Sequence, residues 1–401
     1  MASPVLSELK GRTRGARAFR MIYVAMLLLS LHWAVILYVN STYLKQFVSN
    51  EAIGTLYTIG SALTIIGFLF TSRILRALGN YRLTLGLAAA EFIVLIGLAF
   101  ADSLRVAIPL FVLHQAIVPL LLFNLDVFTE RLIGKDECIT GGKRGLVLTI
   151  MSIAGAIAPL VSGYLLGDEL TPRFMLVYLA SAAFLAAFIF VIVRFFKHVS
   201  DSPYHDINVL GALRRFWLVR DLRFVFFAHF LLQLFFAWMV IYVPLYLATV
   251  IGFSWTDIGI ILFVGLTAYI ICEYPIGEIA DRYIGEKEMM AAGFIILLVS
   301  TSYIGFLKAP LIIPWIITMF MTRVGASLVE VTTESYFFKQ TNAGDANIIG
   351  FFRASRPLAY MLGALFGSLT LLYVDFDYAF LFLGLLMIPG IVFAMLITDT
   401  R

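Results

Sequence analysis

Residues 277–287 read Gly-Glu-Ile-Ala-Asp-Arg-Tyr-Ile-Gly-Glu-Lys and lie between two long apolar runs, 255–277 and 289–307. A membrane-spanning helix needs about 20 mainly apolar residues to cross roughly 30 Å of hydrocarbon. Both runs have this length, so the charged segment between them is a short turn at one membrane surface. Because neither run alternates apolar and polar residues, both predict helices and exclude a β-barrel.

Apolar runs of the same kind occupy most of the chain. Of its 401 residues, 61% are hydrophobic and 13% are charged, whereas soluble proteins carry about 25% charged residues. This composition excludes a water-soluble globule, because there is too little polar surface to cover one. Twelve runs are long enough to span the membrane: 19–39, 52–71, 81–100, 106–130, 145–166, 173–196, 222–248, 255–277, 289–307, 311–338, 347–373 and 377–397. We therefore predict an all-α membrane protein with twelve transmembrane helices.

The connections between these runs are too short to hold an extramembrane domain. The sequence also has no glycine-rich phosphate loop and no Cys and His residues at metal-ligand spacing. The two cysteines, Cys138 and Cys272, give no disulfide framework. An ATP-driven pump is thereby excluded. We expect no enzymatic activity, no metal and no cofactor, with the proton as a possible coupling ion.

A sparse internal repeat relates the two halves of the chain. One common offset pairs Asp126 with Glu330 and Glu130 with Glu334. Internal repeats are frequent in secondary transporters, so we predict two six-helix bundles in parallel orientation. The predicted division is a tail (1–18), a first bundle (19–196), a linker (197–221), a second bundle (222–397) and a C-terminal tail (398–401).

The basic residues predict the orientation in the membrane. Most of the 29 Lys and Arg residues lie on the side of the two termini, and short loops rich in Lys and Arg stay in the cytoplasm. We therefore expect a multi-pass protein of the plasma (inner) membrane with both termini cytoplasmic. One helical face of the linker carries Leu210, Leu213, Phe216 and Trp217, which predicts an amphipathic helix on the cytoplasmic leaflet. The expected partners are membrane lipid and a small-molecule substrate, without nucleic acid, for a monomeric protein.

The turn at 277–287 resembles the signature loop of the major facilitator superfamily, Gly-x-Leu-Ala-Asp-Arg-x-Gly-x-Lys, with one extra residue before the second glycine. The resemblance extends over essentially the whole chain and implies two pseudo-symmetric six-helix bundles that work by alternating access. It assigns no subfamily, because Arg76 stands where the first-half copy usually has aspartate. It also implies a cytoplasmic gate formed by Gly277, Asp281, Arg282, Gly285 and Lys287. The alternative is a solvated turn that only fixes topology.

Ionisable side chains within apolar helices are costly and mark candidate functional sites. Four acids are predicted to couple transport to protons: Asp126, Glu130, Glu330 and Glu334. Asp126 is the first choice for the proton carrier, because the first half has no arginine at the positions equivalent to Arg353 and Arg356 of the second half. The alternative is a helix-end acid paired with a nearby base. Glu91, in the third helix, has two interpretations, an acid packed against a neighbour, which we favour, or a proton site.

The remaining polar groups lie on helices that line the cavity in proteins of the resembling family. The substrate-cavity candidates are His32, Gln115, Asn124, His229, Gln233, Arg323, Arg353 and Arg356. His32 is open to two interpretations, a titrating group or a hydrogen-bonded packing residue. The arginines either brace the second bundle against Glu330 and Glu334 or bind an anionic substrate.

These observations predict a secondary transporter that moves a small molecule by alternating access with proton coupling. Export of a hydrophobic or amphipathic compound is favoured by the apolar cavity helices. Uptake of an organic anion by a symporter is the alternative that the intramembrane arginines favour. A multispan membrane enzyme acting on lipid is the alternative from another class.

Overall fold

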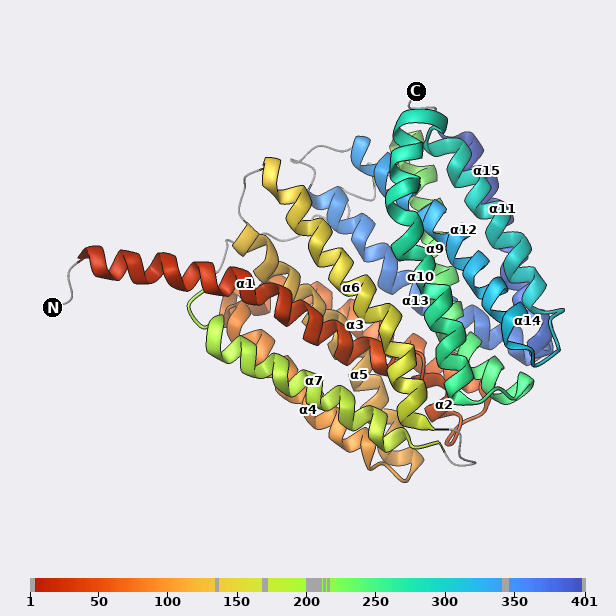
Figure 1. The fold of residues 1–401 in the computed structure, drawn as a ribbon, viewed down its shortest axis with the longest axis horizontal. Coiled ribbons are helices and arrows are strands. Elements are labelled where there is room, and N and C mark those ends of the chain that lie inside the picture. The colour runs from red at the N-terminus through yellow and green to blue at the C-terminus, as the bar shows by residue number, and fades with distance from the viewer. Residues whose placement is uncertain are drawn as a thin grey trace. The chain divides into compact units, whose positions relative to one another are not determined.

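The computed structural model describes residues 4–133, 137–167, 172–199, 211, 214, 217–340 and 346–398. Within these residues every regular element is a helix (Figure 1). The helices are α1 (Pro4–Leu37), α2 (Asn40–Leu44), α3 (Asn50–Leu78), α4 (Asn80–Ala99), α5 (Leu104–Ile133), α6 (Glu137–Leu166), α7 (Phe174–Phe195), α9 (Arg220–Tyr246), α10 (Trp255–Ile279), α11 (Glu286–Ile304), α12 (Ile312–Lys339), α13 (Ala346–Tyr373), α14 (Phe376–Leu385) and α15 (Ile388–Leu396), with π-helical turns η1 (Leu247–Ile251) and η2 (Ala280–Ile284).

The described residues include 11 helical segments that are long and apolar enough to cross a membrane. The helix α13 adds another long helix of 28 residues, which carries Arg353 and Arg356. The last of the 11 segments comprises α14 and α15, which are interrupted before Pro389. These helices confirm the predicted all-α membrane fold with twelve transmembrane helices.

Two glycines occupy equivalent turns in the two halves of the chain. Gly79, between α3 and α4, has φ 77° and ψ 157°. Gly285, between η2 and α11, has φ 98° and ψ 159°. Only glycine adopts this backbone region without strain. The shared conformation supports the internal repeat on structural grounds, although the flanking side chains differ.

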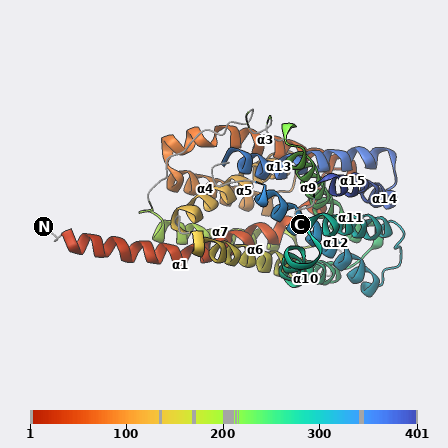
Figure 2. The same ribbon diagram turned by 90° about the horizontal axis from the view of Figure 1, so that it is seen from above.

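The first compact unit comprises Met1–Leu37, Ala62–Ala158 and Arg173–Asp206. Within it, α1 and α4 each pack against both α5 and α7. The first helix begins at Pro4 and extends beyond the other helices of this unit (Figure 2). The segment expected to be a tail thus continues the helix, because no proline interrupts it and its Lys and Arg residues favour helix.

The second compact unit comprises Tyr38–Ser61, Pro159–Pro172 and Ile207–Arg401. Within it, α12 packs on α9, α10 and α11, and α9 also packs on α2, α13 and α15. The ends of α3 and α6 thus group with the second unit, so these units do not divide at the linker. The predicted division into 19–196 and 222–397 stays a prediction. Most of the predicted amphipathic helix lies outside the described residues, although Trp217 is exposed beneath the Arg223 guanidinium.

Candidate functional site

Arg323 lies buried within the second unit. The α12 backbone places it in an apolar stretch, and its side chain is 3% exposed. Its guanidinium carbon lies 5.8 Å from the ring centre of Phe235 on α9, and the guanidinium donates a hydrogen bond to the Tyr38 hydroxyl. Its Nη1 atom has no hydrogen-bond partner in the part of the chain that the structure describes. The guanidinium, which is always charged, therefore has one donor atom without a hydrogen bond.

Two further tyrosines interact electrostatically with Arg323. They are Tyr269 on α10 and Tyr360 on α13, and both are partly exposed. The Tyr269 ring packs edge-on against Phe236, with ring centres 6.2 Å apart. We term Arg323, Phe235, Tyr38, Tyr269 and Tyr360 the arginine cluster.

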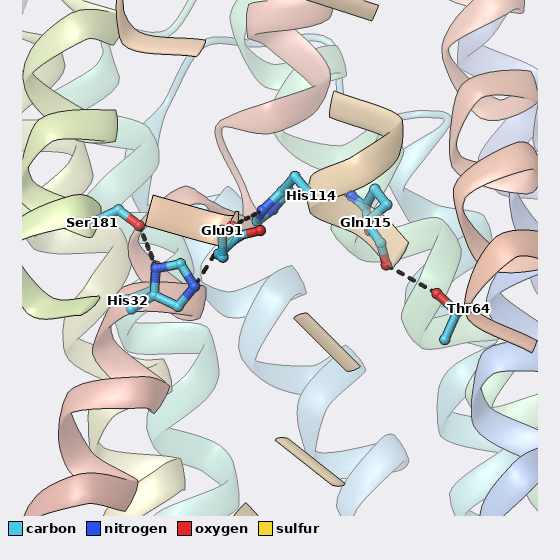
Figure 3. A network of polar contacts seen from close by, with 6 residues as sticks. All are labelled: His32, Thr64, Glu91, His114, Gln115 and Ser181. Atoms are coloured by element: carbon cyan, nitrogen blue, oxygen red, sulfur yellow. Dashed lines mark hydrogen bonds and ion pairs between the residues drawn. The ribbon is translucent and has the colours of Figure 1, made fainter. Parts of the chain in front are cut away.

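A second polar cluster lies inside the first unit (Figure 3). His114 Nδ1 lies 2.5 Å from Glu91 Oε1, and His32 Nε2 lies 3.9 Å from the same oxygen. The other ring nitrogen of His32 lies 2.8 Å from Ser181 Oγ. The side chains come from α1, α4, α5 and α7, and each is at most 2% exposed. We term these four residues the histidine cluster.

The sequence analysis missed His114, although a signal for it was present. Glu91 and His114 stand at nearly equal distances from the short connection between α4 and α5. Two antiparallel helices joined by a short loop place such residues at the same depth. An acid and a histidine at matched depth predict a contact, and the structure shows Glu91 in contact with His114.

The other cavity candidates of the first unit lie apart from the histidine cluster. Gln115 points away from Glu91, and its backbone carbonyl accepts a hydrogen bond from Thr64 (Figure 3). Asn124 is fully buried, its carbonyl accepts from the Asn80 amide, and its own side-chain amide has no partner among the described residues. Both residues belong to α5, so one helix carries a series of buried polar groups.

In the second unit, His229 and Gln233 form one buried pair on α9. Their Nε2 atoms lie 3.3 Å apart, and His229 Nδ1 lies 3.5 Å from Thr333 Oγ1. The imidazole also packs on the Phe352 ring at 4.2 Å between centres, and Phe352 stacks on Phe337. These contacts make His229 part of an aromatic stack in the interior of the unit.

The predicted proton-coupling acids differ in their surroundings. Asp126 is exposed on α5, and its role in proton coupling stays a prediction. Glu330 and Glu334 are half-buried on α12, and Arg356 is exposed on α13. The side chains of Glu130 and Arg353 lie outside the described residues. The described part of the chain also holds no group of His, Cys, Asp and Glu residues suited to a metal ion.

Comparisons with known proteins extend the fold description to a family. Residues 225–401 match the sequence model of the Major Facilitator Superfamily. The fold is similar to that of the nucleoside transporter NupG, with a TM-score of 0.74 and 13% identity over 94% of this chain and 98% of that one. The sequence match covers less than half of the chain, and the solved structure shows that nearly the whole chain has the fold of this transporter.

Two other solved transporters have the same fold at low identity. The POT family transporter PepTSo gives a TM-score of 0.75 at 11% identity, covering 95% of this chain and 97% of that one. The human organic anion transporter MFSD10 (TETRAN) gives 0.64 at 13% identity, covering 95% and 99%. No curated protein matches the chain in sequence. The shared fold and the apolar helices show a multi-pass membrane protein.

The superfamily signature loop adopts a π-helical turn followed by a left-handed glycine. Gly277 lies near the end of α10, and the Gly285 amide donates to the Ala280 carbonyl at 3.2 Å. The side chains of Asp281 and Arg282 lie outside the described residues, and Lys287 is half-buried. The cytoplasmic gate therefore stays a prediction.

Near the end of that loop, Glu286 is fully buried at the start of α11. It accepts a hydrogen bond from Ser335 Oγ at 3.0 Å and forms an ion pair with Lys339. Both partners lie on the last turns of α12. This contact fixes the end of the loop to α12 and was not anticipated from the sequence.

Proposed function

We propose that this protein is a secondary transporter that moves an organic anion with an apolar portion by alternating access, and that transport is coupled to protons. The observation that carries the proposal is the buried Arg323 guanidinium with its unused Nη1 donor. A permanent charge inside a membrane protein costs at least a few kcal/mol. The ring of Phe235 offsets part of this cost, since a cation over an aromatic face gains about 0.5 to 2 kcal/mol.

A carboxylate or similar anion would supply what the cluster lacks. The guanidinium presents donors in a planar fork that matches a carboxylate with two parallel hydrogen bonds. The partly exposed rings of Tyr269 and Tyr360 would contact an apolar portion of the same molecule. The arginine cluster thus favours an anion that also carries an apolar part.

Export of a neutral hydrophobic compound has less support. That hypothesis relied on the aromatic side chains of α9 being available to a ligand. Phe235 and Trp238 are fully buried inside the second unit, where Trp238 packs against Tyr242 and Phe382. Side chains already packed in this way offer little apolar wall to a ligand. A lipid-modifying enzyme also has no support among the solved transporters that share this fold.

The binding test compares aromatic carboxylates with their neutral amides. Purified protein is heated with benzoate or benzamide, and with further matched pairs that carry larger apolar parts. We expect the carboxylates to raise the melting temperature and the amides to leave it unchanged. Arg323→Gln is expected to abolish the carboxylate effect, and Arg356→Gln, at an exposed arginine, to preserve it. Equal effects of acids and amides would overturn the proposal.

For the orientation in the membrane, we propose cytoplasmic termini at the plasma membrane, as the loop charges indicate. A single cysteine introduced at Ser202 in the linker is expected to react with a membrane-impermeant maleimide only after the cells are opened. Labelling of intact cells would contradict this orientation.

A further inference from the structure

The histidine cluster contains a hydrogen-bond arrangement that fixes the tautomer of His32. The Ser181 hydroxyl has one hydrogen, which it donates to the backbone carbonyl of His32 at 2.8 Å. Ser181 Oγ must therefore accept at its other contact, 2.8 Å from His32 Nδ1. The hydrogen of a neutral His32 ring consequently resides on Nδ1. Its Nε2 carries a lone pair.

That lone pair faces a carboxyl group. His32 Nε2 lies 3.9 Å from Glu91 Oε1, and it has no hydrogen-bond partner within the described chain. Glu91 Oε2 is also buried and has no such partner there. The buried Nε2 of His32 thus faces a carboxyl group whose Oε1 contacts His114 and whose Oε2 has no partner among the described residues. A buried polar atom without a partner is unfavourable, and one added proton would provide a donor between them.

The charge of the cluster supports the same conclusion. With neutral histidines and an ionised Glu91, the cluster carries one negative charge at fully buried positions. One added proton makes it neutral, whether that proton resides on Glu91 or on a histidine. His114, at 2.5 Å from Glu91 Oε1, stabilises either form through a short hydrogen bond.

The helices around the cluster bring no other charge to this depth. These helices are α1, α4, α5 and α7, and besides the cluster they supply only the buried phenol of Tyr178, one turn before Ser181. The nearest basic residues on α4 and α5 are Arg82 and Arg105. Each stands nine residues from Glu91 or His114, about 14 Å at 1.5 Å per residue. Along these four helices, a proton is the available means of neutralising Glu91.

We propose that Glu91, His32 and His114 together bind the proton that is coupled to transport. The reaction is the reversible addition of one proton from water to the Glu91–His32–His114 group, with no other bond made or broken. His32 is near the end of α1, and Tyr38, which accepts a hydrogen bond from Arg323, follows six residues later. The proposed proton site and the arginine cluster therefore include residues only six positions apart in the sequence.

Proton binding is tested without any substrate, by infrared difference spectroscopy of the purified protein in lipid nanodiscs between about pH 5 and about pH 8. We expect a single step with carboxyl and imidazole bands, which Glu91→Gln removes. Asp102→Asn, at an exposed acid between α4 and α5 of the same unit, is expected to leave the step unchanged. No step in the wild type, an identical step in Glu91→Gln, or loss of the step in Asp102→Asn would overturn the proposal.

A second variant keeps the test valid if Glu91→Gln does not fold. His32→Asn retains an N–H at the position of Nδ1, so the bond to Ser181 survives while the Nε2 acceptor is lost. The step is expected to move to lower pH by about one unit. An unmoved step would overturn the role of His32.

The transport role of the site rests on the proposed function, whereas the proton site itself does not. In proteoliposomes, Glu91→Gln is expected to exchange labelled benzoate for unlabelled benzoate but to lose accumulation driven by a pH gradient. Accumulation that persists in Glu91→Gln would overturn the coupling role. If the wild type moves no benzoate, the anion proposal fails for this probe, and the infrared step still decides the proton site.

Discussion

Gly163 on α6 and Gly259 on α10 pack backbone against backbone inside the second unit. A Cβ placed on Gly163 would lie 2.5 Å from the Trp255 carbonyl oxygen and 3.3 Å from the Gly259 Cα. A Cβ on Gly259 would lie 2.6 Å from the Pro159 carbonyl oxygen. Such distances are below van der Waals contact, and the atoms met are backbone atoms that cannot rotate away. The end of α6 can therefore lie this close to α10 only because neither position carries a side chain.

From this contact we predict that Gly163→Ala destabilises the protein by about 1 to 3 kcal/mol, the usual cost of overpacking. Thermal unfolding of the purified protein measures the change. Gly155→Ala, on the same helix, is the matched control, because a Cβ there meets no atom within 4 Å. The control is expected to be neutral or slightly stabilising, since alanine favours helix over glycine. Equal melting temperatures of the two variants would contradict the close packing.

The left-handed turn of the signature loop gives a second prediction. Gly285 has φ 98°, which L-residues adopt only with strain. We expect Gly285→Ala to cost at least about 1 kcal/mol, because the variant must strain or rebuild the turn between η2 and α11. Gly86→Ala, in the middle of α4 with open space around the added Cβ, is the control. If Gly285→Ala were as stable as the control, the turn would not require glycine at this position.

The sequence predicted the number of long helices well, because a chain in hydrocarbon must satisfy its backbone within each apolar run. It predicted the depth of a polar residue in the membrane better than the side of the helix on which that residue lies. Asp126 and Asn124 are two residues apart on α5, so the helix turns by slightly more than half a circle between them. Asn124 is consequently fully buried and Asp126 is exposed. Apolar residues surround both positions, so periodicity could not tell which of them faces the interior.

Helix ends and pairings between helices were also beyond the sequence pattern. The first helix starts at Pro4, well before the predicted span at residue 19, because nothing in the basic segment stops a helix. The Glu286 ion pair joins α11 to the end of α12 and depends on how those helices pack. Arg323 could be predicted as an intramembrane charge, but its neighbour Phe235 and its unused donor follow only from the tertiary structure.

A third prediction separates the two interpretations of Arg323. If Arg323 were a structural brace, Arg323→Met would destabilise the protein without ligand. We expect instead that the variant is as stable as the wild type, or more stable by about 1 to 4 kcal/mol, because replacing a buried charge with an apolar side chain of similar volume is often neutral or stabilising. Thermal unfolding without ligand provides the measurement. Arg356→Met, at an exposed position, is the control and should change little. A drop of several degrees specific to Arg323→Met would support the brace.

The last prediction concerns Ser181, which fixes the tautomer of His32 without being able to titrate. In Ser181→Ala, the neutral His32 ring is free to place its hydrogen on Nε2 and to donate it to Glu91. The ionised form of the cluster then gains a donor that the wild type lacks, so its affinity for a proton falls. A net hydrogen bond is worth about 1 kcal/mol, which corresponds to a shift of somewhat less than one pH unit. We expect the infrared step to move to lower pH by that amount. Ser30→Ala is the matched control, because Ser30 is a buried serine on α1 whose hydroxyl bonds no described residue. A shift to higher pH in Ser181→Ala, or an equal shift in the control, would show that Ser181 does not act through the His32 tautomer.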